Sequence, residues 1–216
     1  MFVLYAILVH VAFVLLLPLL LLHPKLREGF WFRLGRYPAS WPGCRGEPVI
    51  WLHGASAGDL LAIQPVLREL RRLRPQACLV LTTVTNSGMA VGRRMREADA
   101  CGYLPYDLPE SVKRAMDLVQ PDLLVLEYTE VWPALIRGAA RAGARIAVIN
   151  GRFNERALGR YRWLYRLIGN PLKRVDLLCM RDQDEAEHAL AIGAAPERVR
   201  VTGNTKFDSC RLQDWF

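Results

Sequence analysis

The stretch PVIWLHGASAGD at residues 48–59 joins a short apolar run to a polar turn. Residues 48–53 are mostly apolar and lie between Gly46 and Gly54, which is typical of a buried strand. Residues 60–73 then place apolar side chains at helical spacing, with arginines on the opposite side. The stretch predicts a strand that turns directly into a helix, so the fold depends on whether this unit repeats.

The unit does repeat along the chain. Further strands are predicted at residues 77–83, 123–126, 145–149, 177–180 and 199–201, with helices at 88–96, 111–119, 133–141, 156–169 and 185–192. Alternating strands and helices with short connections predict a Rossmann-like α/β domain, with a parallel sheet covered by helices on both faces. We place this domain at residues 48–208, followed by a tail at 209–216. Neither G-x-G-x-x-G nor G-x-x-x-x-G-K-[ST] occurs, which weakens the alternative of a generic nucleotide-binding enzyme.

The first two dozen residues have a different character. FVLYAILVHVAFVLLLPLLLL at residues 2–22 carries no charge and would form a helix about 30 Å long. We expect a transmembrane anchor at residues 1–23 and a basic juxtamembrane linker at 24–47; a cleaved signal peptide is the alternative. His10 is expected to be a tolerated polar residue. Basic residues follow the span and none precedes it, which predicts a single-pass protein of the plasma membrane with its domain on the cytoplasmic side.

Composition narrows the classes of partner. The net charge of +8 suits nucleic acid, an anionic membrane surface or a phosphorylated substrate, although simple solubility is an alternative. No nucleic-acid-binding signature is present, so we expect no nucleic acid partner. The cysteines form no C-x-x-C pair and no zinc motif, so we expect neither a metal site nor disulfides.

The first loop after a predicted strand carries a candidate catalytic carboxylate. In an open α/β sheet the ligand lies beyond the carboxyl ends of the strands. Ser56 and Asp59 have the spacing of a helix capping box, and capping alone would explain them. The functional alternative is that Asp59 accepts a proton from a hydroxyl group, while the backbone around Ser56 and Gly58 binds negative charge.

The other strand ends carry candidate substrate-binding residues. Thr83 begins a hydroxyl-rich loop that suits either a sugar or helix capping. Glu130 belongs to a segment with more carboxylates than a turn requires. Asn150 and Arg152 end a strand, and the arginine is either a phosphate ligand or a surface residue. Lys206 follows the last strand closely enough to offset phosphate charge.

These segments together resemble the lipid A Kdo (3-deoxy-manno-octulosonate) transferases of Gram-negative bacteria. The family pattern is H-x-x-S-V-G-E, T-T-x-T-x-[ST]-G, Y-L-P-Y-D, M-E-T-E-L-W-P-N, N-A-R-x-S and T-G-N-x-K-F-D. This sequence shows HGASAGD, TTVTNSG, YLPYD, EYTEVWPA, NGRFN and TGNTKFD in the same order, from the leader to Asp208. The resemblance implies a two-domain GT-B glycosyltransferase of lipopolysaccharide biosynthesis, whose N-terminal half binds the lipid A precursor. A C-terminal domain binds the donor CMP-Kdo, and the sugar is transferred with inversion and without a metal.

The resemblance also assigns roles and exposes departures. It makes Asp59 the general base and lets Lys206 stabilise the transition state. Asp59 stands where the family has Glu, which shortens its reach by about 1.5 Å. Tyr128 stands at the first Glu of M-E-T-E, and Glu127 would point to the other face if its strand continued. The chain stops at Phe216, so we expect the donor domain in a separate chain or lost by truncation. The alternative function is a catalytically inactive, membrane-anchored lipid A-binding half or scaffold.

Overall fold

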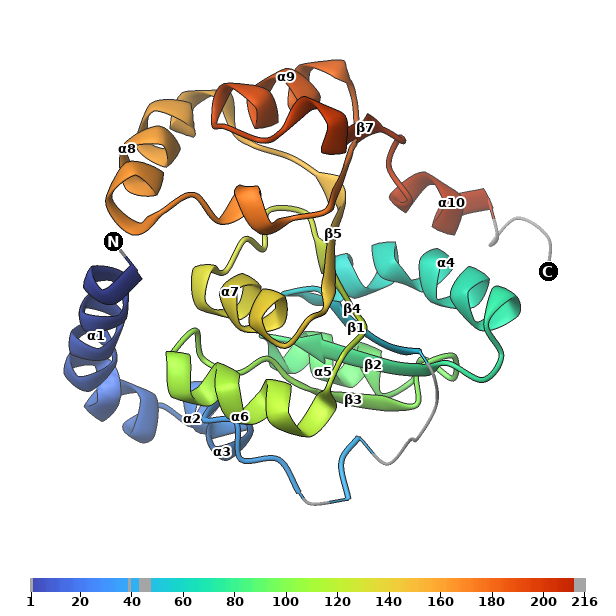
Figure 1. Ribbon diagram of the computed structural model, residues 1–216. Coiled ribbons are helices and arrows are strands. Elements are labelled where there is room, and N and C mark those ends of the chain that lie inside the picture. Colours follow the sequence, from blue (N-terminus) through green and yellow to red (C-terminus); the bar gives the residue numbers. More distant parts are fainter. Residues whose placement is uncertain (1, 39, 43–47, 212–216) are drawn as a thin grey trace.

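A seven-stranded parallel sheet forms the centre of the molecule (Figure 1). The computed structural model describes residues 2–38, 40–42 and 48–211. The strand order is β3-β2-β1-β4-β5-β6-β7. The strands are β1 Val49–His53, β2 Cys78–Thr83, β3 Ala100–Tyr103, β4 Leu123–Glu127, β5 Arg145–Gly151, β6 Leu177–Met180 and β7 Val199–Val201.

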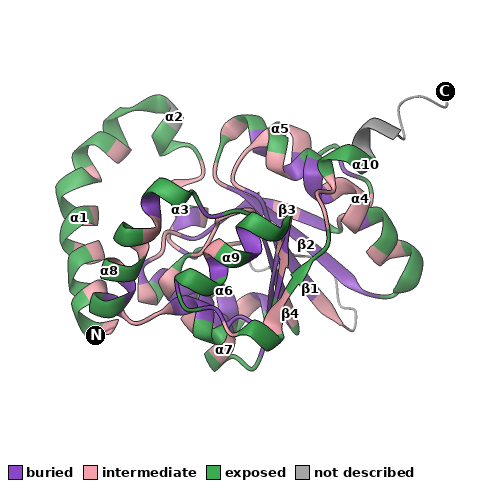
Figure 2. Ribbon diagram, turned by 90° about the horizontal axis from the view of Figure 1, so that it is seen from above, coloured by how far each residue is buried: buried purple, intermediate pink, exposed green. Residues whose placement is uncertain are grey.

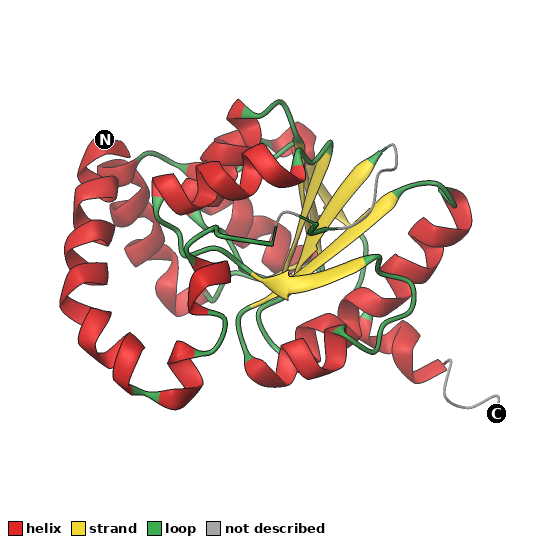
Figure 3. Cartoon of the chain, turned by 90° about the horizontal axis from the view of Figure 1, so that it is seen from below, coloured by secondary structure: helices red, strands yellow, loops and turns green. Residues whose placement is uncertain are grey.

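Helices cover both faces of this sheet, as Figure 3 shows, so the predicted fold class is confirmed. One face carries α4 Ala57–Leu73 and α5 Asn86–Gly92, and the other carries α6 Pro109–Val119, α7 Pro133–Arg141, α8 Leu158–Ile168 and α9 Gln183–Ala191. Short 3-10 turns lie at η1 Glu155–Ala157, η2 Pro171–Arg174 and η3 Pro196–Arg198. The last helix, α10 Lys206–Arg211, lies beside α4 and includes the first residues of the predicted tail; residues 212–216 lie outside the described part.

Alternating side chains build two separate cores. Ile50 and Leu52 of β1 pack toward α4, whereas Trp51 packs toward α6 and α7. All three are buried, because successive side chains of a strand point to opposite faces and helices cover both of them. Figure 2 shows the strands of the sheet mostly in the colour of buried residues. This is why the parallel strands read as continuous apolar runs in the sequence.

Strand β3 is the one strand that the sequence prediction missed. It has only four residues, ACGY, and contains a glycine, which weakens the strand pattern. The glycine has a packing reason. A Cβ on Gly102 would come within 3.0 Å of the Trp41 ring and 3.2 Å of the Phe32 ring. The segment before the sheet therefore packs closely on this edge strand.

The predicted juxtamembrane region is partly packed against the domain. It contains α2 Pro24–Arg27 and α3 Phe30–Arg33, while residues 39 and 43–47 lie outside the described part. Arg33 is buried, with its guanidinium 4.3 Å from the centroid of the Tyr103 ring. Residues near α3 thus behave as part of the domain rather than as an independent spacer.

The apolar leader forms a single helix, α1 Phe2–Leu22. Among the residues that the structure describes, it is the one helix long and apolar enough to cross a membrane, judged by length and composition. It lies along the domain beside α6 and α8 (Figure 1). His10 has a partner that the sequence did not indicate, because its Nε2 lies 2.8 Å from Glu110 Oε2.

One sequence expectation about the cysteines is wrong. Cys101 and Cys179 are free, but Cys78 is disulfide-bonded. Cys78 is buried at the start of β2, within the apolar run that led us to expect a small hydrophobic side chain.

The strand order reverses between β1 and β4. From β1 the chain proceeds outward to β2 and β3, then returns to β4 and continues to β7 in the opposite direction. The carboxyl ends of β1 and β4 are therefore the topological switch point of the sheet. Open α/β sheets bind their ligands at this point. His53 and Glu127 are the last residues of those two strands.

Candidate active site

Asp59 both caps helix α4 and faces a lysine. Ser56 is the N-cap residue, and Asp59 Oδ2 accepts hydrogen bonds from Ser56 N at 3.0 Å and Ser56 Oγ at 2.8 Å. The predicted capping box is therefore present. The other carboxylate oxygen, Oδ1, lies 3.9 Å from Lys206 Nζ. The capping bonds fix the orientation of the carboxylate and leave Oδ1 on the side of Lys206.

Thr83 and Gly58, two other predicted site residues, lie at the loop between β1 and α4. Thr83 is fully buried, and its Oγ1 donates to the carbonyl oxygen of Ala55 at 2.9 Å. This bond ties the first loop to β2, so Thr83 positions the loop. At Gly58, an added Cβ would meet only Ser56 Oγ, at 3.8 Å, which is an ordinary contact. No close approach by another described residue requires glycine there.

A hydrogen-bonded amide joins three separate segments at the carboxyl edge of the sheet. Asn150 has a left-handed conformation (φ 51°) at a register shift in β5, and asparagine tolerates this conformation better than most residues. Its Nδ2 donates to Glu127 Oε2 at 2.8 Å and to Thr205 Oγ1 at 2.7 Å. Its Oδ1 accepts from Thr205 N at 2.9 Å. Because Thr205 immediately precedes Lys206, these bonds also hold Lys206 near the end of β4.

Glu127 is a buried carboxyl in this network. Burial raises its pKa to about 7, and the Asp59 carboxylate adds to the rise. The hydrogen bond from Asn150 and the charges of Lys206 and Arg181 oppose the rise. Strand β4 ends at Glu127, so the alternation of side chains between the two faces does not continue past it. The charges of Asp59 and Lys206 both act on the Glu127 carboxyl. A carboxyl that titrates near neutrality can both donate and accept protons.

Two buried polar atoms at the ends of neighbouring strands lack hydrogen bonds. Within the described part of the chain, Glu127 Oε1 and His53 Nε2 have no hydrogen-bond partner. Glu130 Oε2 lies 3.5 Å from His53 Nε2 and accepts a hydrogen bond from Trp132 Nε1 at 2.7 Å. Both unpartnered atoms belong to residues at the ends of β1 and β4, where a ligand is expected.

Three cations surround the ring of Tyr128. Arg152 Nη1 donates to the Tyr128 hydroxyl at 2.7 Å. Lys206 Nζ lies 5.5 Å and Arg181 Cζ lies 5.8 Å from the ring centroid. Glu185 partly neutralises the two arginines, since its Oε1 lies 3.4 Å from Arg152 Nε and 3.5 Å from Arg181 Nη2. The cluster gathers positive charge from the loops after β5, β6 and β7.

The structure brings most of the sequence-predicted residues together. Asp59, Asn150, Arg152 and Lys206 meet through Glu127, Tyr128 and Thr205. Ser56 joins through the capping box, Glu130 lies beside His53, and Thr83 and Gly58 belong to the first loop. Their roles in binding or catalysis remain predictions.

Sequence reasoning gave no role to three residues of this site, namely His53, Glu127 and Arg181. His53 ends the predicted strand at residues 48–53 and Glu127 directly follows the one at 123–126, and these positions were the available signal. Arg181 follows β6 directly, in a turn to which no motif drew attention. Among the described residues, no group of three or more His, Cys, Asp or Glu side chains is placed to hold a metal ion.

Sequence comparisons connect the chain with one enzyme family. The family described as 3-Deoxy-D-manno-octulosonic-acid transferase (kdotransferase) matches residues 28–209. The 3-deoxy-D-manno-octulosonic acid transferase of Chlamydia trachomatis serovar D is 31% identical over 183 residues, which cover 80% of this chain and 42% of that protein. The protein of the same name from Haemophilus influenzae is 30% identical over 187 residues, covering 86% and 43%. The chain therefore spans less than half the length of these relatives.

Solved structures with the same architecture are more distant in sequence. UDP-GlcNAc 2-epimerase from Neisseria meningitidis, bound to UDP-GlcNAc, aligns with a TM-score of 0.55 and 12% identity over 76% of this chain and 49% of that chain. UDP-N-acetylglucosamine 2-epimerase from Rickettsia bellii aligns with a TM-score of 0.55 and 15% identity, covering 79% and 48%. At these identities the likeness supports the fold alone, in which this domain corresponds to about half of a GT-B-like chain.

Proposed function

Since this chain belongs to the 3-deoxy-D-manno-octulosonic-acid transferase family, we propose that it forms the acceptor-binding half of a glycosyltransferase of lipopolysaccharide biosynthesis. The whole enzyme transfers Kdo from CMP-Kdo to a lipid A precursor, inverts the anomeric centre and uses no metal. The acceptor lies at the carboxyl ends of β1 and β4, and CMP-Kdo binds mainly to a C-terminal domain. The domain works on the cytoplasmic side of the inner membrane, anchored by α1.

The approach of Asp59 to Lys206 is the observation that carries this proposal. These residues come from opposite ends of the domain sequence, yet Oδ1 and Nζ are 3.9 Å apart. Asp59 Oδ1 accepts the proton of an acceptor hydroxyl while that oxygen attacks the anomeric carbon of Kdo. The bond from the anomeric carbon to the phosphate oxygen breaks, and CMP leaves with the electron pair. Lys206 offsets the negative charge that develops during this step.

The remaining residues of the site suit the phosphate and the sugar of the lipid A precursor. Arg152 offers two-pronged hydrogen bonds to a phosphate of the lipid A precursor. Glu127 supplies a second carboxyl, held by Asn150 at the same edge of the sheet. Ser56, Gly58 and the hydroxyl-rich loop after Thr83 orient the sugar part of the acceptor, with Glu130 on its other side.

The alternative function is a lipid A-binding half or scaffold without catalytic activity. The capping bonds to Asp59 Oδ2 favour it, because a carboxylate used for capping needs no chemical role. Tyr128 at the position of a family carboxylate also favours it.

The test is a transfer assay with purified components. The chain, in detergent, is mixed with the separately produced C-terminal domain of the Haemophilus influenzae relative, CMP-Kdo and a lipid A precursor. We expect a Kdo-modified precursor, detected by mass spectrometry, that does not form when either protein is omitted. Binding of the precursor to the chain without any product would instead support the scaffold.

A further inference from the structure

His53, the last residue of β1, is a fully buried histidine whose ring is held by the neighbouring strand β2. Its Nδ1 lies 3.1 Å from the carbonyl oxygen of Thr82. A carbonyl oxygen only accepts hydrogen bonds, so Nδ1 carries a hydrogen and donates it. The Thr82 hydroxyl, 3.2 Å from Nδ1, accepts a hydrogen bond from Trp51 Nε1 at 2.8 Å and donates to the carbonyl oxygen of Leu52 at 3.4 Å. This network fixes the tautomer and the orientation of the ring.

The second ring nitrogen of His53 faces an acceptor. With the hydrogen on Nδ1, a neutral imidazole has only a lone pair at Nε2. Nε2 lies 3.5 Å from Glu130 Oε2 and has no hydrogen-bond partner in the described part of the chain. Asp59 and Glu127 lie at the same edge of the sheet, but within that part neither forms a hydrogen bond or an ion pair with His53. A lone pair and a carboxylate oxygen attract each other only when a proton lies between them, on the ring or on the carboxyl.

Glu130 is the accessible member of this pair. Its side chain is 20% exposed, whereas the His53 side chain is fully buried. Glu130 Oε2 is held from a second side, because it accepts a hydrogen bond from Trp132 Nε1 at 2.7 Å. The backbone of the loop is also tied, since Glu130 N donates to the carbonyl oxygen of Glu127 at 3.3 Å. A ligand at this edge of the sheet therefore reaches the carboxyl of Glu130 and not the ring.

We propose that His53 is a positioning residue for Glu130 in the binding of the acceptor. A proton shared between Nε2 and Oε2 fixes the Glu130 carboxyl, so that its other oxygen, Oε1, accepts a hydrogen bond from a hydroxyl group of the acceptor sugar. This hydroxyl is not the one that Asp59 deprotonates. A carboxyl that is already fixed loses little freedom when the ligand binds. The inference rests on the proposed function, because it needs the acceptor at the carboxyl ends of β1 and β4.

Two substitutions of His53 separate this role from a structural one. The amide nitrogen of asparagine is as many bonds from Cα as Nδ1 is in histidine, and that of glutamine is as many as Nε2. His53→Asn therefore keeps a donor for Thr82, whereas His53→Gln keeps a donor for Glu130. We expect His53→Asn to weaken binding of the lipid A precursor about tenfold, and His53→Gln to bind within about twofold of the wild type. Isothermal titration calorimetry of the whole chain in detergent measures the dissociation constants, and needs no donor domain.

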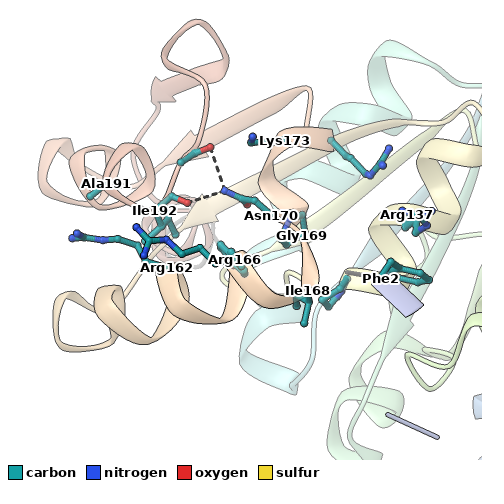
Figure 4. Close-up of a pocket in the computed structure, with 15 residues that line it drawn as sticks. Phe2, Arg137, Arg162, Arg166, Ile168, Gly169, Asn170, Lys173, Ala191 and Ile192 are labelled. Carbon is teal, nitrogen blue, oxygen red and sulfur yellow. Dashed lines mark hydrogen bonds between the residues drawn. The ribbon is translucent and has the colours of Figure 1, made fainter. Parts of the chain in front are cut away.

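A double substitution and a control complete the experiment. Glu130→Ala should weaken binding by a similar factor, and His53→Asn should have little further effect when it is added to Glu130→Ala. Asn170 controls for general destabilisation, because its Nδ2 donates to the carbonyl oxygens of Ile192 at 2.8 Å and Gly193 at 3.4 Å (Figure 4), and none of these residues belongs to the candidate active site. Asn170→Ala should lower the unfolding temperature and leave the dissociation constant unchanged.

Equal weakening by His53→Asn and His53→Gln would overturn the proposal, as would full binding by His53→Asn. If His53→Asn does not fold, nitrogen NMR spectra of the chain labelled at histidine provide a second test. Glu130→Ala should shift the Nε2 resonance of His53 and leave its Nδ1 resonance nearly unchanged. An unmoved Nε2 resonance contradicts the shared proton. A wild-type chain that binds no precursor would instead refute the proposed function, and the spectra do not depend on that result.

Discussion

Asn150 donates a side-chain hydrogen bond to Glu127 Oε2 at 2.8 Å, and both residues are buried at the carboxyl edge of the sheet. The bond fixes one oxygen of the carboxyl and leaves the other without a hydrogen-bond partner in the described part of the chain. Because the pKa of Glu127 lies near 7, its charge changes within the physiological range. The charge balance around Asp59 and Lys206 therefore depends on pH through Glu127.

Replacing Glu127 with glutamine should change the pH dependence of stability. In the folded chain its pKa is raised from 4.5 to about 7, so the folded state binds the proton more tightly than the unfolded state. The free energy of unfolding should fall as pH rises from about 4.5 to 7. Glu127→Gln removes this term and should be more stable than the wild type by roughly 3 kcal/mol at pH 8, with little difference at pH 4. Thermal or denaturant unfolding across this range measures the difference.

A matched variant shows whether this effect belongs to the buried site. Glu155 is an exposed carboxylate in η1, and Glu155→Gln should leave the pH dependence of unfolding as it is in the wild type. If Glu127→Gln and the wild type lose stability in parallel between pH 4 and pH 8, the carboxyl of Glu127 does not titrate as described.

The sequence predicted the layers of the fold because burial on both faces leaves a clear pattern. The predicted strand at residues 145–149 lies within β5, the one at 177–180 is β6, and the helix predicted between them at 156–169 contains α8. Strand β3 has no such pattern, because the rings of Trp41 and Phe32 leave no room for a side chain at Gly102. Those two residues lie some 60 to 70 positions earlier in the chain. A contact of that kind cannot be read from local periodicity.

The candidate site was predicted in part for a similar reason. Asp59 and Lys206 each follow a predicted strand, and the rule for parallel sheets brings such positions to one edge. The place of Glu127 depends on where β4 stops. Tyr128 has a left-handed conformation (φ 65°), which ends the alternation at that point. Tyrosine rarely adopts this conformation, so its sequence gives no hint of it.

Asp107, in the YLPYD segment, should matter for stability. Its carboxylate oxygens accept the backbone N–H groups of Ala134 at 3.0 Å and Leu135 at 2.8 Å, which begin α7. The N-cap residue of α7, Trp132, provides no side-chain cap. Asp107→Ala should therefore lower the free energy of unfolding by about 1–3 kcal/mol, measured by urea denaturation. The exposed Asp117 is the control, and Asp117→Ala should change stability by less than about 0.5 kcal/mol.

Arg152→Ala should weaken binding of the acceptor more than it slows the chemical step. The Arg152 guanidinium is held by the Tyr128 hydroxyl and, like the Lys206 ammonium group, lies within 6 Å of the Tyr128 ring centroid (5.9 Å and 5.5 Å). Loss of one phosphate contact should raise KM for the lipid A precursor about tenfold, with kcat within about twofold. Steady-state kinetics with the supplied C-terminal domain measure both constants. Arg156→Ala removes a nearby exposed charge and should leave KM unchanged; a fall in kcat alone for Arg152→Ala would contradict the binding role.

Asp59→Asn should abolish transfer while leaving the fold intact. An amide oxygen can still accept the hydrogen bonds from Ser56, so the cap of α4 survives and unfolding should shift by less than about 1 kcal/mol. The amide cannot accept a proton from a hydroxyl, so kcat should fall by at least about a hundredfold. Asp122→Asn provides the comparison, because Asp122 accepts Val49 N at the opposite end of the sheet and should leave kcat unchanged. Full turnover by Asp59→Asn would mean that the Asp59 carboxylate serves only as a cap and that another group removes the proton. Glu127 would be the first candidate, because the Asp59 charge affects its pKa.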